Sequence, residues 1–148
     1  MNDTEDFTAA YRRHNELLAQ CNRLNKITVF DALAAAGIDS VTVTFDGEGD
    51  SGQIEDVSAC SAGGPRPLPD IQIEIRRVSW GSEEPEKTQA TLCDAIEELC
   101  YDFLSETHGG WENNDGAFGD FTFSVKDRVI ALDFNGRFSD SINYSHTF

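Results

Sequence analysis

The chain has 148 residues and carries 27 aspartate and glutamate side chains against 11 lysine and arginine side chains, so its formal net charge is −16. This length fits one domain with one hydrophobic core, and we expect residues 1–148 to form a single domain. Hydrophobic residues make up 39%, and ten residues are phenylalanine, which is too much apolar surface for a disordered chain. The strong negative charge argues against direct binding of nucleic acid or of an anionic membrane.

No segment approaches the run of about 18 apolar residues that a membrane span needs, and the first six residues are acidic where a signal peptide is basic. We therefore expect a cytoplasmic protein. The four cysteines are widely spaced, with no pair at the spacing of zinc ligands. Because free cysteine packs like a small hydrophobic residue, we expect buried thiols, with a redox or metal site assembled in space as the alternative. These residues are Cys21, Cys60, Cys93 and Cys100.

Residues 1–37 are predicted to be helical, as two successive helices. From Thr4 to Asn25, apolar residues recur at three- and four-residue steps, which is typical of an amphipathic helix with one buried face. The sequence Thr28-Val29-Phe30-Asp31 is similar to a capping box and predicts a second helix that ends at Gly37. Gly37 followed by Ile38 is typical of a Schellman motif at the helix end.

Residues 38–148 are predicted to mix strands with one long helix. Alternating patterns predict strands at Val41–Phe45, Ile71–Ile75, Phe121–Val125 and Ile130–Phe134, a short strand at Ile54–Val57, and a final edge strand near Phe148. An apolar stripe predicts a helix from about Pro85 to Thr107. The order of elements predicts an α+β domain, with an antiparallel sheet of four to six strands and helices on one face, two of them N-terminal and one long and central.

The negative charge is concentrated in the middle of the chain, where residues 38–110 hold 16 acidic and 4 basic side chains. On the long predicted helix, the face opposite the apolar stripe is acidic, and its like-charge pairs four residues apart cost about 0.2–0.5 kcal/mol each. We predict that this face binds a basic partner protein. A solvated surface that maintains solubility and the composition of a salt-adapted host are the alternatives. The residues are Asp94, Glu97, Glu98 and Asp102.

Carboxylates also alternate along the turn at residues 46–55, as they do in calcium loops. The pattern departs from that of an EF-hand, because the sixth and twelfth positions hold Ser51 and Val57. The turn is predicted to bind Ca²⁺ or Mg²⁺ weakly or to extend the partner-binding surface, and no other cofactor is expected. The carboxylates in question are Asp46, Glu48, Asp50 and Glu55.

The glycine-rich segment at residues 108–119 is a second candidate. It is similar to the oxyanion loop of esterases, but the chain has no G-x-S-x-G nucleophile motif. Trp111 is predicted to be either an exposed anchor for a partner protein or a buried core residue. His108, Glu112 and Asp115 form a possible acid–base set, although we favour a protein that is not an enzyme.

Two segments together resemble a family of small bacterial and phage proteins of unknown function. They are Gly49-Asp50-Ser51-Gly52-Gln53-Ile54-Glu55 and His108-Gly109-Gly110-Trp111-Glu112-Asn113-Asn114-Asp115-Gly116, followed by the strand pair at 121–123 and 130–135. The resemblance extends from the first predicted strand to Phe148. It implies an accessory protein of a plasmid or phage, and such proteins include inhibitors of host defence and regulators of nucleic-acid enzymes.

The leading hypothesis is therefore a non-enzymatic, acidic interaction protein, an accessory or inhibitor protein of a mobile element or phage. It would bind a basic surface on a nucleic-acid-binding protein and thereby mimic nucleic acid. The alternatives are a divalent-cation-binding module or cation-dependent hydrolase that uses the acidic turn, and a soluble domain with no charge-specific partner. The sequence does not indicate the oligomeric state.

Overall fold

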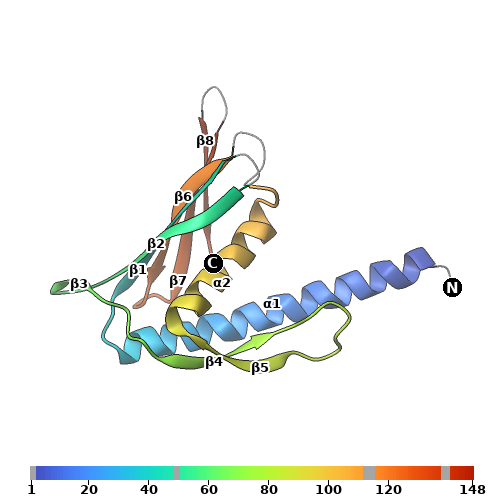
Figure 1. Ribbon diagram of the computed structural model, residues 1–148, viewed down its shortest axis with the longest axis horizontal. Coiled ribbons are helices and arrows are strands. Elements are labelled where there is room, and N and C mark those ends of the chain that lie inside the picture. Colours follow the sequence, from blue (N-terminus) through green and yellow to red (C-terminus); the bar gives the residue numbers. More distant parts are fainter. Residues whose placement is uncertain (1–2, 49–50, 112–115, 138–140) are drawn as a thin grey trace.

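The computed structural model describes residues 3–48, 51–111, 116–137 and 141–148, and these form two helices and eight strands (Figure 1). In chain order, the elements are α1 (Asp3–Ala35), β1 (Ser40–Glu48), β2 (Ser51–Ser61), β3 (Gly64–Arg66), β4 (Gln72–Arg77), β5 (Glu86–Thr91), α2 (Leu92–Thr107), β6 (Ala117–Ser124), β7 (Val129–Arg137) and β8 (Ser141–Thr147).

Six of the strands form one antiparallel sheet in the order β3-β2-β1-β6-β7-β8, while β4 and β5 pair only with each other. The separate β4–β5 hairpin lies along α1, below the sheet in Figure 1. The predicted fold is therefore wrong in its arrangement. The protein is built mainly of antiparallel sheet in two parts, with two helices rather than three, and the long helix is N-terminal rather than central.

The core lies between the six-stranded sheet and the helices. Along β1, Val41, Val43 and Phe45 are buried, whereas the side chains between them are only partly covered or exposed. The stripe of α2 packs on this side of the sheet, and Leu92, Ile96, Leu99 and Leu104 are fully buried. Each buried side chain of this size stabilises the fold by about 1.5–3 kcal/mol. The opposite side of the sheet carries no helix (Figure 1).

The two predicted N-terminal helices are one continuous helix. Thr28 does not cap a new helix, because its Oγ1 donates a hydrogen bond to the Leu24 carbonyl oxygen one turn earlier (3.1 Å). No glycine or proline separates the two predicted segments. The predicted helix end is confirmed, since Gly37 has a φ of 73° and the Ile38 amide donates to the Leu33 carbonyl oxygen (3.1 Å).

The first half of α1 extends beyond the six-stranded sheet and α2, at the right of Figure 1, where the connection between β4 and β5 lies beside it. The prediction of one buried face is wrong there, because the Phe7 and Tyr11 side chains are 63% and 54% exposed. Both contact Trp80, which follows β4 and is itself exposed. The first core residue of α1 among those described is Cys21, and from that point Val29, Phe30 and Leu33 continue the buried face.

The central helix is shorter than predicted, because residues 86–91 form β5. Proline and charged residues at positions 85–87 suggest a helix start, but Thr88 and Ala90 pair with Ile75 and Ile73 of β4. Thr91 then caps α2, since its Oγ1 accepts a hydrogen bond from the Asp94 amide (3.1 Å).

All four cysteines are free thiols, and only two of them fit the prediction of buried side chains. Cys21 and Cys100 are buried, Cys93 is half-buried and Cys60 is exposed. Burial raises the pKa of the Cys100 thiol well above its usual value, so this thiol stays protonated and unreactive. In the described part of the chain, neither helix contains an apolar stretch long enough to cross a bilayer.

Candidate functional site

Within the described residues, the acidic turn at residues 46–55 consists of the paired ends of β1 and β2. β1 extends to Glu48 and β2 begins at Ser51, so Asp46 lies opposite Gln53 in the strand pair. The Asp46 carboxylate is held by Arg137 of β7, with an Nη1–Oδ1 distance of 2.7 Å and an Nη2–Oδ2 distance of 3.1 Å. These hydrogen bonds lower the pKa of Asp46. A cation of the protein itself therefore already neutralises this carboxylate.

Of the other carboxylates of the turn, only Glu55 lies within the described residues. Glu55 is exposed and occupies a bulge in β2, where the strand register shifts opposite Thr44 and Phe45. Asp50 and the Glu48 side chain lie outside the described residues. In the part of the chain that is described, no three histidine, cysteine or carboxylate side chains gather as metal ligands. The calcium or magnesium site stays a prediction that the described geometry does not support.

The two polar segments singled out in the sequence meet at one end of the sheet. Trp111 packs edge-on against Phe45, with ring centroids 5.4 Å apart. Arg137 Nη1, which binds Asp46, also donates to the carbonyl oxygens of Gly47 (3.0 Å) and Ala117 (3.5 Å). Trp111 is only 9% exposed, so its interpretation as an exposed anchor for a partner is wrong. Glu112 and Asp115 lie outside the described residues.

The four predicted acidic residues of α2 have different environments and do not form one solvated face. Asp94 is exposed in the first turn, while Glu97 is half-buried and its pKa is raised by burial and by Asp94. Glu98 is held by Arg77 of β4 through two hydrogen bonds of 2.8 and 3.0 Å. Asp102 faces α1. Glu98 and Asp102 both line a concave region, but Glu98 is already paired with Arg77, whereas Asp102 forms no ion pair within the described residues.

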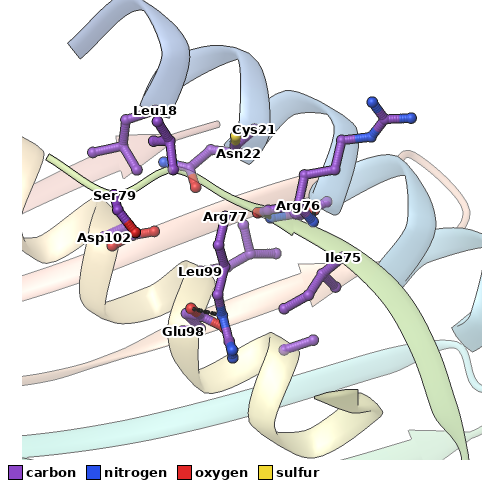
Figure 2. Close-up of a pocket in the computed structure, with 13 residues that line it drawn as sticks. Leu18, Cys21, Asn22, Ile75, Arg76, Arg77, Ser79, Glu98, Leu99 and Asp102 are labelled. Carbon is purple, nitrogen blue, oxygen red and sulfur yellow. Dashed lines mark hydrogen bonds and ion pairs between the residues drawn. The ribbon is translucent and has the colours of Figure 1, made fainter. Parts of the chain in front are cut away.

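This concave region is a cleft between α1, α2 and the end of β4, and it consists of two adjoining hollows of about 220 and 460 Å³. Leu18, Asn22 and Asp102 line both hollows. Figure 2 shows Leu18, Cys21 and Asn22 on α1 along one wall, with Asp102 and Leu99 on α2 facing them. The cleft exists because the N-terminal half of α1 diverges from α2 (Figure 1). We refer to it below as the α1–α2 cleft.

Ionisation of the Asp102 carboxyl group is unfavourable in this cleft. Burial, reinforced by repulsion from Glu98 and Glu106, raises its pKa from 3.8 to about 6. Arg77 is already bound to Glu98, and no ion pair between Asp102 and any basic side chain is formed within the described residues. A buried carboxylate that lies near other carboxylates and has no ion-pair partner does not stabilise the fold. Such groups are typical of binding sites.

Because the ionised Asp102 destabilises the folded state, we predict that removing its charge stabilises the protein. Because the pKa is raised in the folded state, the free energy of unfolding falls as pH rises from 3.8 to about 6. This difference corresponds to about 3 kcal/mol for a group cut off from water, and partial solvation reduces it. We expect Asp102→Asn to raise the free energy of unfolding by about 1–2 kcal/mol near neutral pH. Urea denaturation should show no gain below about pH 4.

The control for this prediction is Glu74→Gln, which removes the same charge from an exposed position on β4. We expect that change to alter the free energy of unfolding by less than about 0.5 kcal/mol. An equal gain in both variants would mean that overall charge, and not the position of Asp102, sets the effect. A loss of stability in Asp102→Asn would contradict the described burial of the carboxylate.

Asn22 adds a second polar group to the cleft, which sequence reasoning missed. Asn22 is only 9% exposed, yet its side-chain amide has no hydrogen-bond partner in the described part of the chain. The amide lies across the cleft from Asp102 (Figure 2). A carbonyl oxygen and a carboxylate that face one space are suited to share a ligand with several N–H donors, such as an ammonium or guanidinium group.

The uncovered side of the sheet is a second acidic surface that the sequence did not reveal. Strand register places Asp56, Thr44, Asp120 and Asp133 in one row across β2, β1, β6 and β7. Burial and the neighbouring Asp133 raise the pKa of Asp120. Each of these strand patterns contains an acidic residue at a polar position, and this was the sequence signal for the surface. Only the strand register shows that the residues are neighbours.

Comparison with known proteins identifies the relatives of this chain but no activity. A model of the family of unknown function DUF6878 matches residues 21–148. No curated protein and no solved structure matches the chain. The match includes the second half of α1, so the common segment begins earlier than the predicted resemblance. It contains Asn22 and Asp102 of the α1–α2 cleft, whereas the cleft residues Tyr11, Asn15, Leu18 and Ala19 precede it. The chain belongs to the family of unknown function DUF6878.

Proposed function

We propose that the protein is a non-enzymatic interaction protein whose α1–α2 cleft binds a lysine or arginine side chain on the surface of a basic partner protein. The observation that carries this proposal is Asp102, a half-buried carboxylate between Glu98 and Glu106 that no described basic residue neutralises. An incoming cation would relieve the repulsion that raises the pKa of Asp102. Binding would thus remove an electrostatic repulsion that destabilises the unbound protein at this position.

The shape and polarity of the cleft support the same proposal. Leu18 and Tyr11 offer apolar surface to the methylene groups of a long basic side chain, while Asp102 and Asn22 offer oxygen acceptors. A space of about 460 Å³ has room for one such side chain. The net charge of −16 would speed the encounter with a basic partner. Glu97 and Asp94 on the same helix would contribute to this field rather than to direct contacts.

The wider parts of the proposal rest on the sequence. Origin from a bacterium or phage, a cytoplasmic location and a role as an inhibitor of a nucleic-acid-binding protein follow from the family resemblance and the charge. A surface that mimics nucleic acid would present carboxylates at spacings similar to those of phosphates. The row Asp56, Asp120 and Asp133 lies on the side of the sheet away from α2, so it would form a second acidic surface, separate from the cleft. The partner would then be displaced from nucleic acid when it binds.

Affinity capture with purified variants tests the proposal. We expect wild-type protein to retain one or a few basic host proteins, with binding that weakens as salt concentration rises. Asp102→Asn should reduce capture at least about tenfold, because loss of one member of a sheltered ion pair costs about 2–5 kcal/mol. Since this variant is expected to be more stable than wild type, a loss of capture would not reflect unfolding.

Glu74→Gln is the matched control and should capture the same proteins as wild type. Binding should also weaken below about pH 6, where Asp102 takes up a proton. Equal capture by wild type and Asp102→Asn would refute the role of the cleft. Capture that does not depend on salt would refute the electrostatic basis of the proposal and would favour a domain with no charge-specific partner.

A further inference from the structure

Two histidines that are far apart in sequence meet beside the C-terminal end of α2. The Nε2 atoms of His108 and His146 lie 2.8 Å apart. His108 is the residue that ends α2, and its amide donates to the Leu104 carbonyl oxygen (2.8 Å). His146 lies on β8, opposite Leu132 of β7. The pair is therefore held by a helix end and a paired strand rather than by a loose loop.

Aromatic rings fix the orientation of both imidazoles. The His108 ring stacks on Phe134, with centroids 3.7 Å apart and an interplanar angle of 4°. The His146 ring stacks on Phe148 at 6.2 Å, and Phe148 in turn stacks on Phe103 at 4.5 Å. Both histidines are half-buried, so the Nε2 atoms are oriented in advance and water still reaches the pair. Such preorganisation is what a metal site requires of its ligands.

We propose that His108 and His146 form a two-histidine site for a divalent transition-metal ion that prefers tetragonal coordination, namely Cu²⁺ or Ni²⁺. Two nitrogens that bind one ion at a right angle lie about 2.9 Å apart when each bond is about 2.0–2.1 Å long. Two nitrogens at a tetrahedral angle lie about 3.3 Å apart. The observed 2.8 Å matches the first arrangement more closely.

The chemical state of the pair suits this role. Histidine binds metal ions through a neutral imidazole nitrogen, and each Nε2 atom of the pair can supply one such lone pair. In the hydrogen bond between the neutral rings, one Nε2 donates its proton and the other accepts it. An ion bound to both Nε2 atoms would replace this hydrogen bond, and the donating ring would carry its proton on Nδ1 instead. Because no group of three possible ligands gathers in the described residues, water molecules fill the remaining positions.

Calorimetric titration with Ni²⁺ tests this site. Every protein in the test carries Cys60→Ser, because the exposed Cys60 thiol would bind metal independently. We expect uptake of one Ni²⁺ per chain. His108→Gln/His146→Gln should lower the affinity by more than the factor of about 10–100 that loss of an outer-shell partner costs. His14→Gln, which changes the third histidine of the chain, should leave the affinity unchanged.

A second measurement guards against unfolding of the double variant. His146→Gln alone keeps the His108 ring on Phe134 and should weaken Ni²⁺ binding by the same large factor, with an unchanged far-ultraviolet circular dichroism spectrum. Absence of saturable Ni²⁺ binding by the wild-type protein would overturn the proposal and leave the pair as a structural hydrogen bond. Equal binding by wild type and His146→Gln would overturn it as well. This outcome is independent of the partner that the α1–α2 cleft binds.

Discussion

Replacing Gly119 by alanine is expected to lower the free energy of unfolding by about 3 kcal/mol or more. Gly119 lies on β6 between Phe45 of β1 and Phe134 of β7. A Cβ at this position would lie 2.0 Å from the Asp133 carbonyl oxygen and 3.0 Å from the Phe45 ring. The carbonyl oxygen is part of the backbone of the neighbouring strand, so it moves only if β6 and β7 separate locally.

The absence of a side chain at Gly119 also allows two aromatic rings to meet. Phe45 and Phe134 are stacked at 6.0 Å even though β6 runs between their strands. Gly136→Ala on β7 is the matched control, since nothing lies within 4 Å of a Cβ there. Urea denaturation followed by circular dichroism should show a large loss for Gly119→Ala and a change of less than about 1 kcal/mol for Gly136→Ala. Similar values for the two variants would contradict the described approach of β6 and β7.

Asn25→Ala is expected to lower the free energy of unfolding by about 2–4 kcal/mol, because it leaves two backbone groups without partners. The Asn25 side chain donates from Nδ2 to the Arg76 carbonyl oxygen (2.9 Å), and its Oδ1 accepts from the Arg76 amide (2.8 Å). Asn25 is only 8% exposed. Through this residue, α1 completes the hydrogen bonding of β4 on the edge that β5 does not cover.

The effect of Asn25→Ala should be concentrated in the β4–β5 hairpin. Hydrogen exchange should become faster at the Arg76 amide and along residues 72–91, while β1 and β6 keep their protection. Asn15→Ala, at an exposed position on the same helix, should change the free energy of unfolding by less than about 0.5 kcal/mol. If Asn25→Ala were equally mild, the two hydrogen bonds would not be what attaches the hairpin to α1.

The sequence located strands well where one side of the strand is buried. The predicted strands at 41–45, 71–75, 121–125 and 130–134 correspond to β1, β4, β6 and β7, although Ile71 and Val125 each lie one residue outside the observed strand. Strict alternation predicted them because it indicates burial of one face. β5 was missed, since Glu86-Lys87-Thr88-Gln89-Ala90-Thr91 contains little apolar alternation. It is a strand because its backbone pairs with β4. The two N-terminal helices were predicted separately because Thr28 is a residue type that caps helices. In the structure, its side chain instead donates to the Leu24 carbonyl oxygen and the helix continues.

The candidate site depends on contacts that no local pattern contains. Helical periodicity placed Asp94 and Asp102 on the same acidic face, and only the position of α1 makes Asp102 different. Asn22 and Asn25 are similar in sequence terms, yet one is bound to β4 and the other faces the cleft. His108 and His146 are 38 residues apart and meet only because β8 returns beside α2. Such sites arise from topology rather than from spacing.

α1 is one continuous helix that crosses the start of the family match. The family match begins at Cys21, which is also the first buried residue of the helix among those described. A helix of 33 residues is about 50 Å long, and its first half contributes almost nothing to the core. The family match therefore begins inside one unbroken helix instead of in a loop. Because the helix is continuous, its buried second half fixes the direction in which the residues before Cys21 are presented.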